Sequence, residues 1–339
     1  MVKKENSYLA SLGLIGEQLE QATGESLAVF KKYDFSNVEN IVVGAMGGSQ
    51  LGADLVLATL EKELKVPVTQ IRDYVLPKFV SKKSLVILIS YSGSTEEILS
   101  LAESARKTGC KIAIISAGGK LSELAKKYNL PAYIFTPRFN PAGQPRLGTG
   151  YVLAPFLVLL QLCKAVIAKE NLASNIAQAG KLMEKDKVLI TKTKQIAKLL
   201  KGKVVLVVAG EFLKGSAHIL ANQLNESAKQ LAWPAYLPEV NHHLMEGLTC
   251  PATNQKNLAV LFLNSSFYTP RIAKRLNLTE LVVKKQKIKT INFSLKGTFG
   301  QQAIGWAIFG GRLAWELSLL NKTNPLDIRW VNFFKKKLG

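Results

Sequence analysis

Four stretches of the chain combine glycine, hydroxyl and charged residues in patterns that could bind an anion or move a proton. They are GAMGGSQLG at 44–52, SYSGSTEE at 90–97, NPAGQPRLGTG at 140–150 and NQLNESAKQLAWPAYLPEVNHHLMEG at 222–247. Glycine lets backbone N–H groups approach a ligand closely, and hydroxyls add hydrogen bonds to them. The first three stretches therefore suit an anion, and the fourth supplies acid–base groups.

The hydroxyls of SYSGSTEE lie where an apolar run becomes an amphipathic helical pattern. Ser90 ends the run SLVILIS at 84–90, and Ser92 and Thr95 follow it. A helix start favours an anion because its first N–H groups have no partner. Ser94 or Thr95 could instead cap the helix. Gly48 and Ser49 occupy an equivalent place after NIVVGA at 40–45. Neither loop has the G-x-G-x-x-G or G-x-x-x-x-G-K-[ST] spacing of nucleotide sites, so a phosphomonoester fits better.

Charged residues in the other two stretches suggest catalysis. Arg146 lies in a loop rich in glycine and proline, where it could hold an anion or an oxyanion, or could be an ordinary surface arginine. Glu226 lies in a helical pattern, and His242 and His243 follow it. A glutamate and a histidine without a nearby cysteine indicate acid–base work rather than zinc binding.

The elements that must position these residues alternate between apolar strands and helices. We expect strands at 40–45, 84–90, 111–116 and 131–136, and after a polar stretch again at 203–210, 257–264 and 287–294. Wholly apolar strands separated by helices predict parallel sheets covered on both faces. The sequence thus predicts an α/β fold, with an N-terminal domain at 1–155, a helical connector at 156–200 and a C-terminal domain with a helical tail at 201–339.

Composition bears on nucleic-acid binding, membrane insertion and cellular location. Of 339 residues, 45 are Lys or Arg and 24 are Asp or Glu, which gives a net charge of +21. The lysines are scattered and show no nucleic-acid-binding motif, so we interpret them as a basic solvated surface. The apolar segment 151–168 contains Gln161 and Lys164, which favours a buried helix over a membrane span. Three cysteines without metal spacing and no signal peptide predict a reducing, cytoplasmic location.

Taken together, the four stretches resemble the bifunctional phosphoglucose/phosphomannose isomerases, which are built from two sugar-isomerase (SIS) domains. GGS, SYSGSTEE, QPRLG and NES…LPEVNHH…EG occur here in the order of that family. The resemblance covers nearly the whole chain. It implies two SIS domains, each a three-layer αβα arrangement around a parallel sheet.

The resemblance also implies roles for particular residues. Substrate phosphate would be bound by Gly48, Ser49, Ser90, Ser92 and Thr95. Arg146 would stabilise the enediolate, and Glu226 would move a proton between C2 and C1. His242, from a partner subunit of a homodimer, would assist ring opening and contact substrate. A lysine near the C-terminus would share that work: Lys335 fits best, with Lys336 and Lys337 as the alternatives.

The reaction implied is the reversible isomerisation of glucose 6-phosphate or mannose 6-phosphate with fructose 6-phosphate, without a metal or an organic cofactor. Two alternatives stay open. One is a non-catalytic SIS protein that senses sugar phosphates and associates with nucleic acid, as the charge of +21 would allow. The other is the isomerase half of a glucosamine-phosphate synthase, which would normally carry a glutaminase domain with a cysteine near its N-terminus, whereas the first cysteine here is Cys110.

Overall fold

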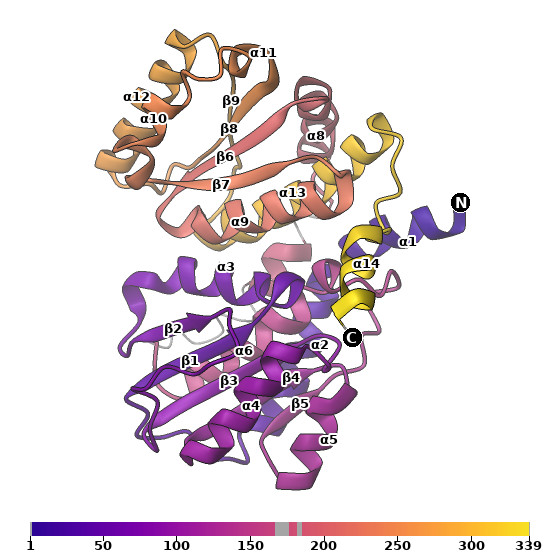
Figure 1. Cartoon of the computed structure of the whole chain (residues 1–339), viewed down its shortest axis with the longest axis vertical. Coiled ribbons are helices and arrows are strands. Elements are labelled where there is room, and N and C mark those ends of the chain that lie inside the picture. The colour runs from indigo at the N-terminus through magenta and orange to yellow at the C-terminus, as the bar shows by residue number, and fades with distance from the viewer. Residues whose placement is uncertain (1, 167–175, 182–184, 339) are drawn as a thin grey trace. The chain divides into compact units, whose positions relative to one another are not determined.

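The computed structural model describes residues 2–166, 176–181 and 185–338, which divide into two compact units (Figure 1). One unit comprises Gly13–Leu182 and is called the N-terminal unit below. The other comprises Met183–Gly339 together with Met1–Leu12 and is called the C-terminal unit. Each unit is described by itself.

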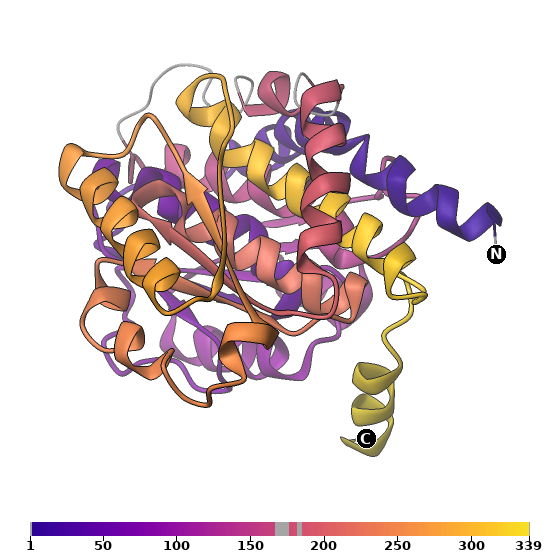
Figure 2. The ribbon, with the colours of Figure 1, turned by 90° about the horizontal axis from the view of Figure 1, so that it is seen from above.

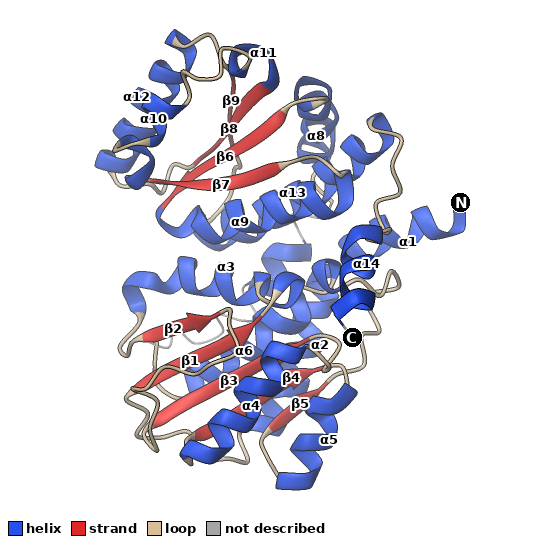
Figure 3. Ribbon diagram, viewed as in Figure 1, coloured by secondary structure: helices blue, strands red, loops and turns tan. Residues whose placement is uncertain are grey.

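A five-stranded parallel sheet forms the centre of the N-terminal unit (Figure 3). The strand order is β2-β1-β3-β4-β5, with β1 at Asn40–Ala45, β2 at Val68–Ile71, β3 at Ser84–Ser90, β4 at Lys111–Ser116 and β5 at Ala132–Ile134. The helices are α2 (Ile15–Phe30), α3 (Leu51–Leu60), α4 (Glu96–Thr108), α5 (Gly119–Tyr128) and α6 (Gly150–Leu162).

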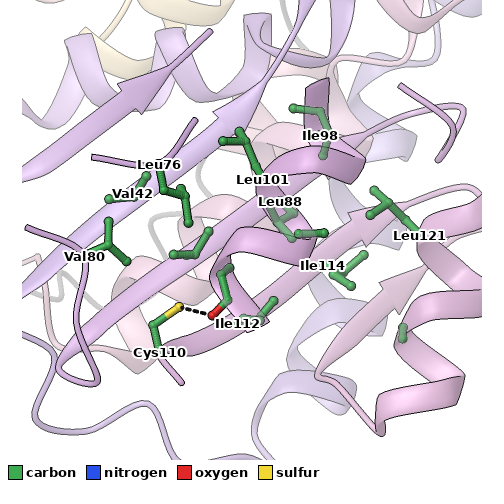
Figure 4. Packing of buried hydrophobic residues seen from close by; sticks show 14 residues of the cluster. Val42, Leu76, Val80, Leu88, Ile98, Leu101, Cys110, Ile112, Ile114 and Leu121 are labelled. Atoms are coloured by element: carbon green, nitrogen blue, oxygen red, sulfur yellow. Dashed lines mark hydrogen bonds between the residues drawn. The ribbon is translucent and has the colours of Figure 1, made fainter. Parts of the chain in front are cut away.

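Apolar packing on one face of this sheet fixes where α4 begins. All seven residues of β3 are buried, and α4 buries Ile98, Leu101, Ala102 and Ala105 against the sheet (Figure 4). Leucines from α5 join the same cluster. Because α4 is anchored by this face, its N-terminus stays at the carboxyl end of β3, the edge at which open parallel sheets bind ligands.

The C-terminal unit has a four-stranded parallel sheet in the order β7-β6-β8-β9. The strands are β6 (Val204–Gly210), β7 (Ala232–Leu237), β8 (Leu258–Asn264) and β9 (Lys289–Ser294). The helices are α1 (Val2–Leu12), α8 (Lys187–Leu200), α9 (Lys214–Gln223), α10 (Leu244–Gly247), α11 (Asn254–Asn257), α12 (Pro270–Lys285), α13 (Phe299–Leu320) and α14 (Arg329–Leu338). Helices flank both faces of the sheet, which gives three layers (Figures 1 and 3).

The long helix α13 organises the C-terminal unit. A capping box begins it, in which the Thr298 side chain accepts from the backbone of Gln301 while the Gln301 side chain accepts from the backbone of Thr298. Further along, Gly310 leaves no room for a side chain, because an added Cβ would lie 2.3 Å from Gln223 Oε1. Helix α9 therefore packs closely on α13, and the turn after α9 is held against it.

The N-terminal helix α1 belongs to the C-terminal unit. Its Tyr8 hydroxyl donates to the carbonyl of Gly311 (3.0 Å), and the Tyr8 ring stacks on Trp315 with 5.4 Å between ring centroids. Helix α14 follows an extended segment at the other end of the chain, and all of its described residues are exposed (Figure 2).

The expected strands occur in the structure, but two edge strands were missed. β2 has the mixed sequence VTQI and is half-buried, so it lacks the apolar run by which the other strands are recognised. β7 contains Pro234, a residue that is untypical of a strand interior. A proline is tolerated there because β7 lies at the edge of its sheet, where a missing N–H costs least.

The division into units also differs from the expected domain limits. A boundary at residue 155 would cut through α6, whose buried residues extend from Gly150 to Leu160. The contacts instead place the whole of α6 in the N-terminal unit and α8 in the C-terminal unit. The apolar segment that begins at Tyr151 is a buried helix, and none of the described helices is long and apolar enough to cross a membrane.

Candidate active site

Two of the sequence motifs meet directly at the carboxyl edge of the five-stranded sheet. The GGS motif forms a short turn, η1 (Gly47–Ser49), which contacts a second short turn, η3 (Pro145–Leu147), in the QPRLG motif. A Cβ added to Gly48 would lie 2.9 Å from the backbone nitrogen of Arg146. Only glycine allows this approach, so the identity of Gly48 follows from the close contact between the two loops.

Ser49 joins the same turn to the SYSG loop. Its side chain is buried, and its Oγ accepts a hydrogen bond from the backbone N–H of Tyr91 (2.9 Å). The loops after β1 and β3 are therefore tied together by a side-chain hydroxyl. In this structure, the Ser49 hydroxyl bonds to the protein backbone at the candidate site.

The remaining hydroxyls of the motif form a small network. Ser90 Oγ lies 2.8 Å from Thr95 Oγ1 and accepts from the N–H of Gly93 (3.1 Å). Ser90 is buried and Thr95 half-buried, whereas Ser92 is exposed and accepts only a long bond from the N–H of Ser94 (3.4 Å). Ser90 thus shapes the loop, and of the three hydroxyls expected to bind phosphate here, Ser92 and Thr95 are the ones that solvent reaches.

Thr95 occupies the position of a helix cap without acting as one. It is the N-cap residue of α4, yet its side chain makes no capping hydrogen bond, because Oγ1 bonds to Ser90 instead. The first-turn N–H groups of α4 thus receive no bond from the Thr95 side chain. The capping interpretation of Thr95 is therefore wrong in this structure, and the first turn of α4 also carries the carboxylates of Glu96 and Glu97.

A loop that the sequence analysis did not single out supports the SYSG motif. Gly93 has φ +70°, and a Cβ there would lie 1.7 Å from the carbonyl oxygen of Gly118 in the loop after β4. The Gly118 N–H is held by Ser116 Oγ (3.2 Å). The signal was present in the sequence, because SAGG follows an apolar strand just as GGS and SYSG do.

Arg146 is buried, with 2% of its surface exposed, so it is not an ordinary surface arginine. It lies in η3, and its NH1 group donates to Gln144 Oε1 (3.0 Å). Transferring a guanidinium from water into a protein is costly unless opposite charge or hydrogen bonds compensate. Its burial beside Gly48 therefore places a fixed positive charge at the edge of the sheet.

Gln18 of α2 holds the loop that carries Arg146. It is wholly buried, and its Nε2 donates to the carbonyls of Phe139 (3.0 Å) and Leu147 (2.9 Å). Its Oε1 accepts from the N–H of Gly150 (3.3 Å). One side chain therefore joins both ends of the loop. Sequence reasoning missed it because Gln18 lies more than a hundred residues away from its partners.

Tyr91 and Asn140 connect the same loop to the SYSG motif. The Asn140 Nδ2 group donates to the Tyr91 hydroxyl (2.8 Å) and to the carbonyl of Gln144 (2.9 Å). Burial raises the pKa of Tyr91, although the hydrogen bond from Asn140 opposes this. The phenol is therefore neutral at ordinary pH and serves here as a hydrogen-bonding contact between two loops.

In the C-terminal unit, Glu226 lies on an irregular turn. A π-helical turn, Leu224–Ala228, follows α9 and ends at Lys229, which has φ +54°. The adjacent Asn225 bonds to both backbone groups of Ala232 at the start of β7 (2.6 and 3.0 Å). π-turns are frequent at functional sites, and this one leaves the Glu226 side chain half-buried.

The two histidines differ in their surroundings. Both are exposed and follow the short turn η6 (Glu239–Asn241). His243 Nε2 lies 3.5 Å from Glu239 Oε1, whereas no hydrogen bond to the imidazole of His242 is found among the described residues. His242 is therefore the histidine whose ring is available to another group.

Lys335 lies on α14 with Lys336 and Lys337, and all three are exposed. The candidate residues fall into two sets. One sheet edge of the N-terminal unit gathers Gly48, Ser49, Ser90, Ser92, Thr95 and Arg146. Three separate segments of the C-terminal unit carry Glu226, His242 and Lys335.

Within the described part of the chain, no group of three His, Cys, Asp or Glu side chains could hold a metal ion.

Comparisons with known proteins agree with this architecture. The SIS domain model matches residues 34–139, and the model for the bacterial phospho-glucose isomerase C-terminal SIS domain matches residues 190–338. The C-terminal domain of glucosamine-fructose-6-phosphate aminotransferase from Francisella tularensis superposes with a TM-score of 0.71 at 16% identity, covering 94% of this chain and 97% of that one. The fold is therefore that of a protein with two SIS domains.

Curated relatives identify the family. The bifunctional phosphoglucose/phosphomannose isomerase of Aquifex aeolicus is 30% identical over 312 residues, covering 90% of this chain and 92% of the relative. The enzyme of the same name from Caldicellulosiruptor bescii is 28% identical over 336 residues, covering 95% and 96%. The chain belongs to the bifunctional phosphoglucose/phosphomannose isomerase family.

The role of Gln18 can be tested by Gln18→Met, which keeps the volume and removes three hydrogen bonds. We expect backbone amides in 139–150 to exchange hydrogen faster and the free energy of unfolding to fall by about 2–4 kcal/mol, because buried backbone groups lose their partners. Mass spectrometry of hydrogen exchange and urea unfolding measure the two effects. Thr23→Val is the control, since the Thr23 hydroxyl donates within α2, to the carbonyl of Leu19 (2.7 Å). Unchanged exchange in 139–150 would show that the loop is held by other contacts.

Proposed function

We propose that the chain catalyses the reversible isomerisation of glucose 6-phosphate and mannose 6-phosphate with fructose 6-phosphate, as the names of its relatives indicate. The observation that carries the proposal is the meeting of the GGS turn, the SYSG loop and the buried Arg146 at one sheet edge. Such an edge suits a small phosphorylated substrate. The proposal places the reaction in glycolysis and gluconeogenesis.

The substrate phosphate binds in the N-terminal unit. The first turn of α4, together with Ser92 and Thr95, supplies N–H and hydroxyl donors, and Gly48 lets the η1 turn approach closely. Ser49 and Ser90 act mainly by holding these loops in place. Binding energy from the phosphate, which does not react, then positions C1 and C2 of the sugar against the catalytic groups.

The chemical steps move protons only. His242 and Lys335 open the pyranose: one protonates the ring oxygen and the other removes the proton of the C1 hydroxyl. Glu226 takes the proton from C2 of the open aldose, and its carboxylic acid returns that proton to C1. Arg146 stabilises the negative charge of the cis-enediolate between the two transfers. Atoms balance, because the proton of C2 moves to C1 while the hydroxyl proton of O2 moves to O1.

The assembly and location of the enzyme complete the proposal. A homodimer would let the exposed His242 ring enter the active site of a second copy. Cys110, Cys163 and Cys250 are free thiols, which supports a reducing compartment such as the cytoplasm. The named relatives are enzymes, which supports catalysis over the alternative of a silent sugar-phosphate sensor.

The phosphate contact can be tested by Thr95→Val, which keeps the shape of the side chain and removes its hydroxyl. We expect the KM for fructose 6-phosphate to rise about tenfold, because a hydrogen bond to a charged group is lost. Stability should fall by only about 1 kcal/mol, because Ser90 Oγ loses its bond to Thr95 Oγ1 but keeps the one from the N–H of Gly93. Thr108→Val, at the other end of α4, is the matched control and should keep its KM. A normal KM in Thr95→Val would place the phosphate elsewhere.

The base is tested by Glu226→Gln, which preserves the shape and removes the proton acceptor. We expect kcat to fall by at least about a hundredfold while fructose 6-phosphate still stabilises the protein in a thermal shift. NMR in deuterated water should then show that exchange of the C1 proton is lost. Glu239→Gln and Glu246→Gln, two exposed carboxylates in the same stretch, are the controls. Normal exchange in Glu226→Gln would mean that another group accepts the proton.

Alanine variants of the two histidines test which of them takes part in catalysis. We expect His242→Ala to slow the turnover of ring-closed glucose 6-phosphate at least about tenfold more than His243→Ala, because only His243 pairs with Glu239 in the structure. A coupled assay that detects fructose 6-phosphate measures both rates. Small and equal effects at the two positions would remove His242 from the mechanism.

A further inference from the structure

The C-terminal unit contains a basic pocket between α12 and the segment that carries His242. Its cavity volume is about 320 Å³, and it is lined by Asn241, Met245, Arg271, Lys274, Arg275, Leu278, Thr279 and Val282. We call it the α12 pocket. It belongs wholly to the C-terminal unit, whereas the phosphate contacts proposed above belong to the N-terminal unit.

The lining of the pocket carries an excess of positive charge. Arg271, Lys274 and Arg275 contribute three cations, and none of the described residues that line the pocket is acidic. Two carboxylates on neighbouring segments have other partners. Glu239 pairs with His243 (3.5 Å), and Glu280 accepts from Lys284 (2.7 Å) and Asn292 (2.6 Å). Cations that converge on a hollow in this way repel one another, and an anion relieves that repulsion.

The position of the cations on α12 strengthens the preference of the pocket for an anion. All three lie in the first two turns of a helix of 16 residues that has no acidic residue in its first turn. Positive side chains are normally favoured at the opposite end of a helix. Glu211, which accepts from the N–H and Oγ1 of Thr269 (both 3.0 Å), is one carboxylate at this helix start. One carboxylate against three cations leaves a net positive charge.

Apolar side chains complete the lining of the pocket, and we call them its apolar wall. Leu278 and Val282 lie on α12 beside the cations, Met245 lies on α10, and half of the surface of Leu278 is exposed. The volume lies at the small end of the range for ligand sites. From the charge, the apolar wall and the volume together, we infer that the α12 pocket binds a small organic phosphate whose anionic group contacts Arg271, Lys274 and Arg275.

Asn241 connects this pocket to the candidate active site. Its Oδ1 accepts from Arg275 NH1 (3.1 Å), and its Nδ2 donates to Thr279 Oγ1 (2.6 Å). A phosphate would compete with Asn241 for the Arg275 guanidinium, and Asn241 directly precedes His242. Occupancy of the pocket would thus alter how the His242 segment is held. This consequence for catalysis rests on the proposed function, whereas binding to the pocket does not.

The test uses phenyl phosphate, which combines an anionic group with an apolar ring, and inorganic phosphate as a second probe. Isothermal titration calorimetry of the full chain should show that Arg271→Gln/Arg275→Gln weakens phenyl phosphate binding at the pocket by at least about tenfold. Lys256→Gln/Lys285→Gln removes two charges from exposed positions of the same unit and should bind like the wild type. Thr95→Val should also retain this binding, because it alters only the N-terminal unit.

Hydrogen exchange locates the site without any measurement of activity. Phenyl phosphate should protect residues 241–245 and 270–282 in the wild type and in Thr95→Val, but not in the double arginine variant. Equal titrations for the wild type and the double arginine variant would overturn the inference, and so would loss of all binding in Thr95→Val. A shift of the double arginine variant to a smaller species in size-exclusion chromatography would show instead that the pocket is a contact between copies. Failure of the proposed function would appear as absent isomerase turnover with this binding intact.

Discussion

Close contact between loops at the carboxyl edge of the five-stranded sheet is the constraint on which the candidate site depends. Gly48 must lack a side chain for η1 to reach Arg146, and Gly93 must lack one for the SYSG loop to pass Gly118. With the loops this close, the Ser49 hydroxyl can bond to the backbone of Tyr91. The hydroxyls of the motifs therefore divide into two groups, of which the buried ones join loops and the accessible ones face solvent at the helix start. Loops that are held together by such contacts before a ligand arrives lower the cost of ordering the site on binding.

Buried polar side chains behind this edge hold the loop that carries Arg146. Gln18 and Asn140 satisfy backbone groups of the loop that carries Arg146, so that a buried guanidinium is held by a loop with few free backbone groups. Buried hydrogen bonds of this kind add modestly to stability but are costly to break. They restrict the loop to one arrangement, and a fixed positive charge is useful to an enediolate only if it does not need to reorganise.

In the C-terminal unit, part of the chain's positive charge is concentrated at one pocket. The net charge of +21 is spread over the whole sequence, and most lysines are exposed singly or in short runs. The α12 pocket differs because Arg271, Lys274 and Arg275 face one hollow with an apolar wall. A basic surface raises the concentration of anions nearby without selecting among them, whereas a hollow that combines several cations with apolar contacts can select.

The sequence by itself determined the class of fold, most of the strands and the family, because parallel strands buried on both faces are continuous apolar runs and because GGS, SYSG and QPR are local motifs. It also indicated Arg146, Glu226 and the pair of histidines as residue types suited to isomerisation. It missed β2 and β7, since edge strands need neither a full apolar run nor every N–H, and it placed a domain limit inside α6, where only packing shows that the helix is one element. Tertiary structure alone decided that Arg146 is buried, that Thr95 does not cap α4, and that Gln18 holds a loop more than a hundred residues away. These properties depend on which side chains are brought together by folding, and no spacing along the chain encodes them.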